Sequence, residues 1–301
     1  MRPRLLYVVA TATALRFPAW RRRGVYRNRP DMPPLDNIAR EIGEAAPWTA
    51  PKWVWSFCWR LQKRLLPLLH RWDAAAPENT CVNLQVLWLK AIAGDDCAYE
   101  LLPRRTRLCV ARPLRRFYPR LHHQNVKLRA TFLDAAARSE LREDSALVVL
   151  GAGFDTRVSR LRPARGVEVD LDDVVTQKRG LAARLERFEP AELLACDLSG
   201  PDVPAVLAEA VAGQSHVVYV LEALLIYLDD AAAARLLRAC AETRCETVSL
   251  VFADRLPGVK GVAEADAARV LADAGFGLVR FLPKPGLARH MGVARRRGDA
   301  S

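Results

Sequence analysis

The chain has 301 residues, enough for one large α/β domain or two smaller ones with a substantial core. No run of 18 apolar residues occurs in it, so the sequence predicts no membrane-spanning helix. The formal net charge is +12, but residues 1–30 hold eight arginines and no acid, so residues 31–301 contribute only +4. This distribution excludes a basic, nucleic-acid-binding surface as a property of the whole chain.

Residues 1–30 form a basic N-terminal tail. An arginine-rich, acid-free start is typical of organelle transit segments, although this one contains no serine. The apolar residues 5–15 are too few to cross a bilayer. A targeting segment, a weak membrane-surface contact and a plain basic tail all remain open. We therefore expect a cytoplasmic protein, or an organellar one if residues 1–30 act as a transit segment.

Residues 31–123 form a second zone, for which the sequence predicts a mainly helical region. Apolar positions within residues 54–69 follow helical spacing, with basic residues on the other side. Such a helix either docks on a domain or lies on an anionic membrane surface. Residues 83–93 predict another helix that ends at Gly94, and the proline- and arginine-rich residues 103–120 predict an irregular connection.

From residue 124 to residue 301, predicted helices and strands alternate. Such alternation indicates a parallel sheet with right-handed crossovers, that is, an α/β fold with a doubly wound, Rossmann-like sheet and an N-terminal helical extension. The predicted strands are 147–150, 167–169, 193–196, 217–221, 247–252 and two more within 277–295. The predicted helices are 124–142, 172–188, 203–212, 229–242 and 262–274.

A nucleoside site is predicted where the first of these strands ends. Gly151 and Gly153 follow this strand and allow a sharp turn with close approach to a ligand. Asp170 ends the next strand, where an acid accepts hydrogen bonds from ribose hydroxyls. Asp197 and Glu222 also follow strands, so the three acids are expected to line one cleft. Their alternative role is to cap helix N-termini.

The same turn favours a cofactor without phosphate over a dinucleotide. Thr156 stands where a dinucleotide fingerprint has its third glycine, and Asp155 would bring a negative charge toward a pyrophosphate. S-adenosyl-L-methionine fits better than NAD. We expect no metal site, because the cysteines form no CxxC pair and the adjacent His122 and His123 point to different faces of a helix.

Several motifs occur together in a fixed order. They are LGAGFDTR at 150–157, EVDLDDV at 168–174, DL at 197–198, LEALLIYL at 221–228 and GLARHMGVA at 286–294, with Arg129 and Asp134 five residues apart upstream. Together they resemble the leucine carboxyl methyltransferase family over residues 124–294. The resemblance implies a Rossmann-like methyltransferase sheet and an S-adenosylmethionine-dependent O-methyltransferase.

The resemblance also implies roles for individual residues. Gly151, with Gly153, lies against the cofactor, and Asp170 holds its ribose. Asp197 and Leu198 bracket the adenine. At the amino-acid end of the cofactor, Glu222 contacts the ammonium group and Arg129 the carboxylate. Tyr227 faces the methyl acceptor, so Arg129 and Tyr227 are the candidate catalytic residues.

The acceptor is less well defined. A carboxylate is already ionised and needs only an orienting cation such as Arg129 or Lys127. A hydroxyl acceptor would need a base, for which His122, His123 and Tyr227 are the candidates. We favour a carboxylate of a protein C-terminus or a small molecule, and expect no nucleic-acid partner. A tRNA-directed methyltransferase and a non-catalytic nucleoside-binding protein remain alternatives. The lysine- and tyrosine-bearing lid near an Asp-Pro, found in relatives that act on protein phosphatases, is not recognisable in residues 31–123.

Overall fold

The computed structural model describes residue 60 and residues 78–93, 95–103, 120–183, 185, 191–261, 263–283 and 290–298. The predicted N-terminal tail, the predicted helix at 54–69 apart from residue 60, and the connection at 103–120 apart from its two end residues lie outside the described residues. The side chains of His122, His123 and Lys127 also lie outside them.

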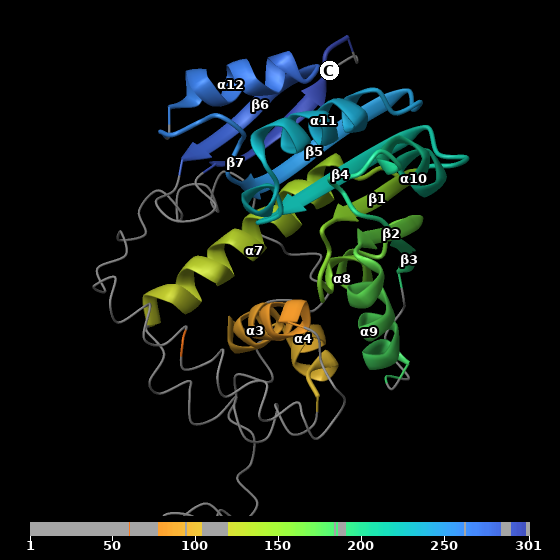
Figure 1. The fold of residues 1–301 in the computed structure, drawn as a ribbon, viewed down its shortest axis with the longest axis vertical. Coiled ribbons are helices and arrows are strands. Elements are labelled where there is room, and N and C mark those ends of the chain that lie inside the picture. The colour runs from red at the N-terminus through yellow and green to blue at the C-terminus, as the bar shows by residue number, and fades with distance from the viewer. Residues whose placement is uncertain are drawn as a thin grey trace, which may run out of the picture.

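A seven-stranded sheet forms the centre of the fold, in the order β3-β2-β1-β4-β5-β7-β6 (Figure 1). Strands β1 to β5 pair in parallel, while β7 runs antiparallel to both β5 and β6. The predicted doubly wound sheet and the predicted final pair of strands are thus confirmed. The strands are β1 (Ser145–Leu150), β2 (Arg165–Asp170), β3 (Glu192–Ala195), β4 (His216–Glu222), β5 (Thr247–Asp254), β6 (Phe276–Pro283) and β7 (His290–Arg296).

The helices follow the predicted order, with differences at their ends. The helix predicted at 172–188 ends at Ala182, and the one predicted from residue 83 begins at Glu78. Three short elements, α4, α8 and η2, were not predicted because they are too short to show helical periodicity. The described helices are α3 (Glu78–Ala93), α4 (Asp96–Leu101), α7 (Arg120–Glu140), α8 (Arg157–Leu161), α9 (Asp172–Ala182), α10 (Val203–Ala210), η2 (Leu225–Tyr227), α11 (Asp230–Ala241) and α12 (Glu264–Asp273).

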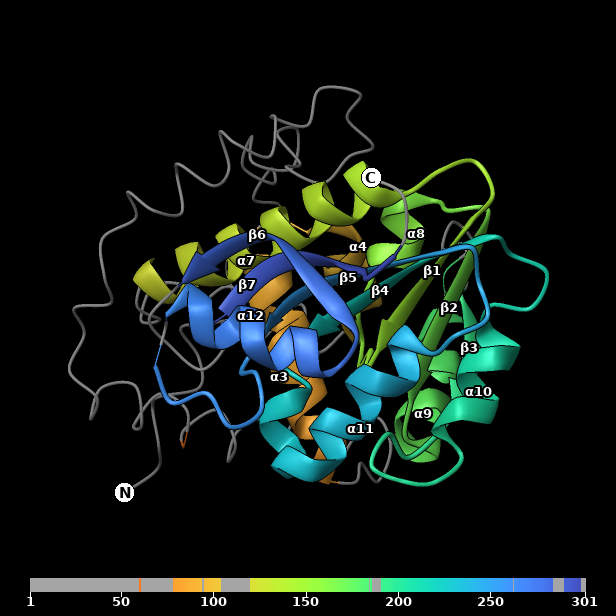
Figure 2. The ribbon, with the colours of Figure 1, turned by 90° about the horizontal axis from the view of Figure 1, so that it is seen from above.

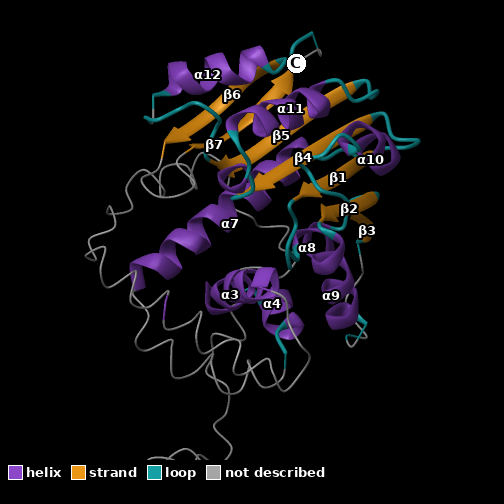
Figure 3. Ribbon diagram, viewed as in Figure 1, coloured by secondary structure: helices purple, strands orange, loops and turns teal. Residues whose placement is uncertain are grey.

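Helices cover both faces of the sheet (Figure 2). Alternate residues of β1 point to opposite sides: Val148 packs in the cluster that includes α10, α11 and α12, and Val149 in the cluster that includes α7 and α8. Because β1 and β4 are covered on both faces, they are almost continuously apolar, as is expected of central parallel strands. In Figure 3 the arrowheads of β4 and β5 lie together, and β7 runs the opposite way.

The N-terminal helices α3 and α4 pack beside the carboxyl ends of the central strands. Leu84 and Trp88 of α3 share a buried cluster with Phe154 of the turn after β1 and Val174 of α9. This cluster brings α3 to the carboxyl ends of the central strands. The division of the chain at residues 30 and 123 remains a prediction. Among the described residues, every helix is too short or too polar to cross a membrane.

Candidate functional site

A cleft of about 550 Å³ opens at the carboxyl ends of β1, β2, β3 and β4. Its position is the one that a doubly wound sheet offers to ligands, beside the point where the strand order reverses. The structure brings every site residue expected from the sequence to this cleft. They are Arg129, Gly151, Gly153, Asp170, Asp197, Leu198, Glu222 and Tyr227.

The turn after β1 depends on its two glycines. Gly151 and Gly153 have φ angles of +62° and +50°, in the left-handed region that favours glycine. A Cβ atom on Gly151 would lie 2.6 Å from Cδ1 of Leu224, and one on Gly153 would lie 2.7 Å from Oδ1 of Asn83. Side chains at these two positions would therefore collide with the walls of the cleft.

Asp170 is held in place by the same turn. Its Oδ2 accepts a 2.6 Å hydrogen bond from the Gly153 N–H, and its Oδ1 accepts one of 2.8 Å from the Leu171 N–H. Burial raises the pKa of Asp170, although these two N–H donors oppose the shift. Each carboxylate oxygen has a second lone pair, so the half-buried group is able to accept two further hydrogen bonds from a diol.

Asp197 and Leu198 line the cleft after β3. Oδ1 of Asp197 accepts hydrogen bonds from both the N–H and the hydroxyl of Ser199, which lower its pKa. Leu198 is buried beside it. The alternative role as helix caps is wrong for Asp170 and Asp197, because Leu171 and Asp202 occupy the N-cap positions of α9 and α10.

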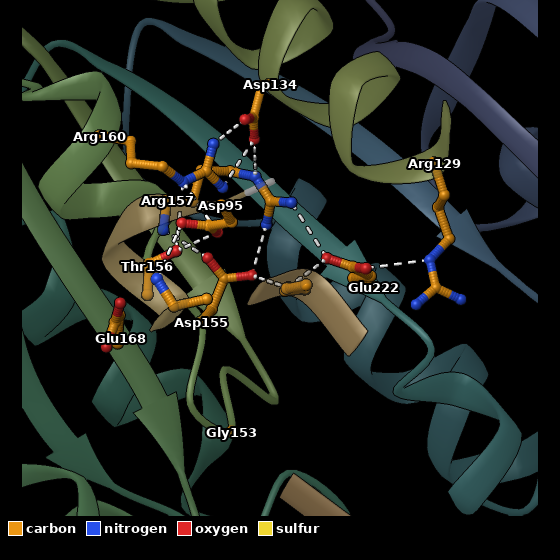
Figure 4. A network of polar contacts seen from close by, with 12 residues as sticks. Asp95, Arg129, Asp134, Gly153, Asp155, Thr156, Arg157, Arg160, Glu168 and Glu222 are labelled. Carbon is orange, nitrogen blue, oxygen red and sulfur yellow. Dashed lines mark hydrogen bonds and ion pairs between the residues drawn. The ribbon is translucent and has the colours of Figure 1, made fainter. Parts of the chain in front are cut away.

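Glu222, at the end of β4, is surrounded by three cations (Figure 4). Its carboxylate is 3.0 Å from Nζ of Lys90, 2.9 Å from Nε of Arg129 and 3.0 Å from Nη2 of Arg157. Burial by itself would raise the pKa of Glu222, but these cations together hold it well below the usual value. Glu222 is thus an anion at neutral pH.

These contacts belong to a larger buried network. Arg157 is fully buried and also bonds Asp134 and Asp155. Five cations and five carboxylates take part, so the network is formally neutral and meets the requirement that buried charges be paired. Its charged members are Lys90, Arg129, Arg157, Arg160 and Lys178 with Asp95, Asp134, Asp155, Glu168 and Glu222.

The structure corrects the interpretation of Asp155. Its side chain is only 3% exposed, 2.7 Å from Lys90 and 2.9 Å from Arg157, and these cations keep its pKa low despite burial. Asp155 lines the cleft, but Lys90 and Arg157 balance its charge, so it brings no uncompensated negative charge toward a pyrophosphate. Thr156, the residue in the place of the third glycine, donates its hydroxyl to Asp95 of the N-terminal region.

Lys90 of α3 is the site residue that sequence reasoning missed. The side chain of Lys90 is 5% exposed, lines the cleft and bonds both Asp155 and Glu222. Its signal in the sequence was a single charge inside the otherwise apolar residues 86–93, which indicates a buried, paired cation. Residues 31–123 therefore contribute a charged side chain to the cleft, which the sequence alone did not predict.

Tyr227 lies at the rim, on the 3₁₀ turn η2, and the residue is 68% exposed. Partial burial and the Asp254 carboxylate raise its pKa, although solvent screens part of this effect at so exposed a position. Tyr227 is therefore protonated at neutral pH and is poorly suited to act as a base.

Comparisons with solved structures gave several partial likenesses. The pyocyanin biosynthetic protein PhzM is 18% identical, with a TM-score of 0.40, and the alignment covers 78% of this chain and 83% of that one. Magnesium protoporphyrin IX methyltransferase from Synechocystis PCC 6803 is 16% identical, with a TM-score of 0.36, over 50% and 67% of the two chains. LaPhzM is 18% identical, with a TM-score of 0.38. That match covers 58% of this chain and only 58% of the length of LaPhzM. These values carry no functional argument.

The sequence comparisons are more specific. No curated protein sequence matches the chain. The family model of leucine carboxyl methyltransferase matches residues 93–241, which contain Arg129, the glycine turn and all three strand-end acids. The cofactor of that family is S-adenosylmethionine. Residues 93–241 of this chain therefore match the leucine carboxyl methyltransferase family, a family of S-adenosylmethionine-dependent methyltransferases.

Proposed function

We propose that the protein transfers the methyl group of S-adenosylmethionine to a carboxylate oxygen, on a protein C-terminus or a small molecule. The observation that supports this most is the charge arrangement of one cleft. Asp170 stands on the side where a ribose would lie, and the ion pair of Arg129 and Glu222 stands on the side of β4. A nucleoside joined to an amino acid is complementary to this arrangement.

The residues present fit the cofactor. Glu222 is an anion that complements an ammonium group, and Arg129 complements a carboxylate. Arg129 uses Nε for Glu222, and among the described residues no hydrogen bond engages its two terminal nitrogens. Figure 4 shows these nitrogens directed away from Glu222. The cleft volume of about 550 Å³ is within the range of small-molecule sites.

When bound, S-adenosylmethionine supplies a methyl group on a sulfonium, which an acceptor oxygen takes by in-line displacement to leave S-adenosylhomocysteine. A carboxylate acceptor loses no proton in that step, so the protein has only to position it and exclude water. The described cleft favours this type of acceptor: Tyr227 is protonated, and Asp155 and Glu222 are paired with cations. None of the described lining residues is a histidine.

The test is methyl transfer from S-adenosylmethionine labelled in the methyl group. The purified protein would be incubated with peptides that end in a free carboxylate, with the same peptides amidated at the C-terminus, and with small carboxylic acids. Methyl esters release labelled methanol in mild base, whereas methyl ethers do not. We expect base-labile label that depends on a free carboxylate.

Two outcomes would contradict the proposal. Base-stable label on a hydroxyl compound would show a different acceptor. Label incorporated into RNA and released by nuclease would favour the tRNA-directed alternative. Glu222→Gln serves as the control for enzyme-dependent transfer, because it removes the anion that we assign to the ammonium group.

A further inference from the structure

Asp254, the last residue of β5, is fully buried and makes three hydrogen bonds to backbone N–H groups. Its Oδ2 accepts from Leu224 at 2.6 Å and from Leu225 at 2.9 Å, and its Oδ1 accepts from Arg255 at 2.8 Å. The two Oδ2 bonds cross from β5 to the segment that follows β4. Asp254 is not among the described residues that line the cleft.

The segment that Asp254 holds forms one wall of the cleft. It begins with Glu222, passes through Ala223 and Leu224, and ends in the η2 turn that carries Tyr227. Leu224 is the residue that a Cβ on Gly151 would meet, so the segment also packs against the glycine turn.

The backbone of this segment is strained at Ala223. Its φ angle is +56°, in the left-handed region where a residue with a Cβ is disfavoured by about 1–2 kcal/mol. The Ala223 N–H is bonded to the carbonyl of Ala253, and the next two N–H groups are bonded to Asp254. These bonds fix the strained turn and, with it, the direction in which Glu222 leaves β4.

We propose that Asp254 is a positioning residue: by anchoring the N–H groups of Leu224 and Leu225, it keeps Glu222 directed at the methionine end of the cofactor. This inference rests on the proposed function. It predicts an effect on ligands that have an amino-acid end and none on ligands that lack it. Asp170 ends β2, and Asp197 and Leu198 follow β3. The side chains of Asp170 and Asp197 accept hydrogen bonds from Gly153, Leu171 and Ser199, none of which belongs to this segment.

The test compares two ligands by titration calorimetry of the whole protein. S-adenosylhomocysteine has the amino-acid end, and methylthioadenosine has only the nucleoside. Asp254→Ala should weaken the binding of S-adenosylhomocysteine by about fivefold or more, which is the effect of losing one to two net hydrogen bonds. The affinity of this variant for methylthioadenosine should remain within about twofold of that of the wild type. Asp254→Asn, whose amide oxygen is still able to accept from Leu224 and Leu225, should keep most of the affinity.

A second substitution tests the link through Ala223. Glycine adopts positive φ without strain, so Ala223→Gly should hold the turn without the anchor. The double variant Ala223→Gly with Asp254→Ala should therefore recover at least about twofold in affinity for S-adenosylhomocysteine. It also offers a better-folded background if Asp254→Ala alone is unstable.

Glu140→Gln is the matched structural control. Glu140 is a partly buried carboxylate, bonded to Ser249 and Arg295 at the end of α7, away from the lining of the cleft. The Glu140→Gln substitution should lower the melting temperature without changing the ratio of the affinities for S-adenosylhomocysteine and methylthioadenosine. Equal losses for both ligands in Asp254→Ala, wild-type affinity in that variant, or no recovery in the double variant would each overturn the inference. A wild-type protein that binds neither ligand would overturn the proposed function, and the inference with it.

Discussion

Lys90→Met is the substitution that tests the buried charge network most sharply. Nζ of Lys90 lies 2.7 Å from Asp155 and 3.0 Å from Glu222, and the side chain is 5% exposed. Methionine preserves most of the apolar stem and removes the charge. Loss of one partner from a buried ion pair costs about 3–5 kcal/mol, because a carboxylate is left buried without compensation. Arg157 still bonds both carboxylates, at 2.9 and 3.0 Å, so neither is left without a cation. We therefore expect the free energy of unfolding to fall by about 3 kcal/mol, the lower end of this range.

Urea unfolding followed by circular dichroism would measure this loss. With a denaturant slope of about 3 kcal/mol per molar, the midpoint should fall by about 1 M. Lys260→Met is the matched control: Lys260 is exposed, and its replacement should change the free energy of unfolding by no more than about 0.5 kcal/mol. If Lys90→Met were as stable as the control, the contacts of Lys90 with Asp155 and Glu222 would not carry the energy that we assign to them.

Three further results are expected. Asp170→Ala should weaken S-adenosylmethionine binding by about 2–3 kcal/mol in calorimetry, since hydrogen bonds to a charged group would be lost, and unchanged affinity would show that Asp170 does not hold the ribose. Gly153→Ala should lower the free energy of unfolding by at least about 1 kcal/mol, because φ is +50° and the new Cβ would lie 2.7 Å from Asn83; thermal unfolding like that of wild type would refute this strain. Burial raises the pKa of Asp254 from 3.8 to about 6, so the folded state binds this proton more tightly than the unfolded chain and stability is lost as the pH rises through that range. Relative to Asp254→Asn, the wild type should lose about 2 kcal/mol of unfolding free energy between pH 4 and pH 7, and a pH-independent difference would contradict the shift.

The sequence predicted the sheet well because its long elements have strong patterns. Apolar runs such as β1 and β4, separated by helices of about ten residues, leave few alternatives to a parallel sheet. The predicted bounds differ from the observed ones mainly at the ends of α3 and α9, where helical periodicity fades. The five-residue α8 and three-residue η2 are too short to carry any periodicity.

The site was predictable only as far as it follows from strand ends. Asp170, Asp197 and Glu222 could be assigned because the carboxyl ends of parallel strands meet at one edge. The contact of Lys90 with Glu222 spans 132 residues of sequence, and that of Asp254 with Leu224 spans 30. Only the packing of α3 on the sheet, and of β5 beside β4, creates these contacts. The targeting, membrane-surface, compartment and partner expectations remain predictions.

The central claim is that the cleft binds S-adenosylmethionine rather than a dinucleotide. Titration calorimetry of the full chain with S-adenosylmethionine, and separately with NAD, tests it directly. We expect one bound S-adenosylmethionine per chain, with binding weakened by about 2–3 kcal/mol in Asp170→Ala, and no heat of binding with NAD. Binding of NAD without binding of S-adenosylmethionine would contradict the account.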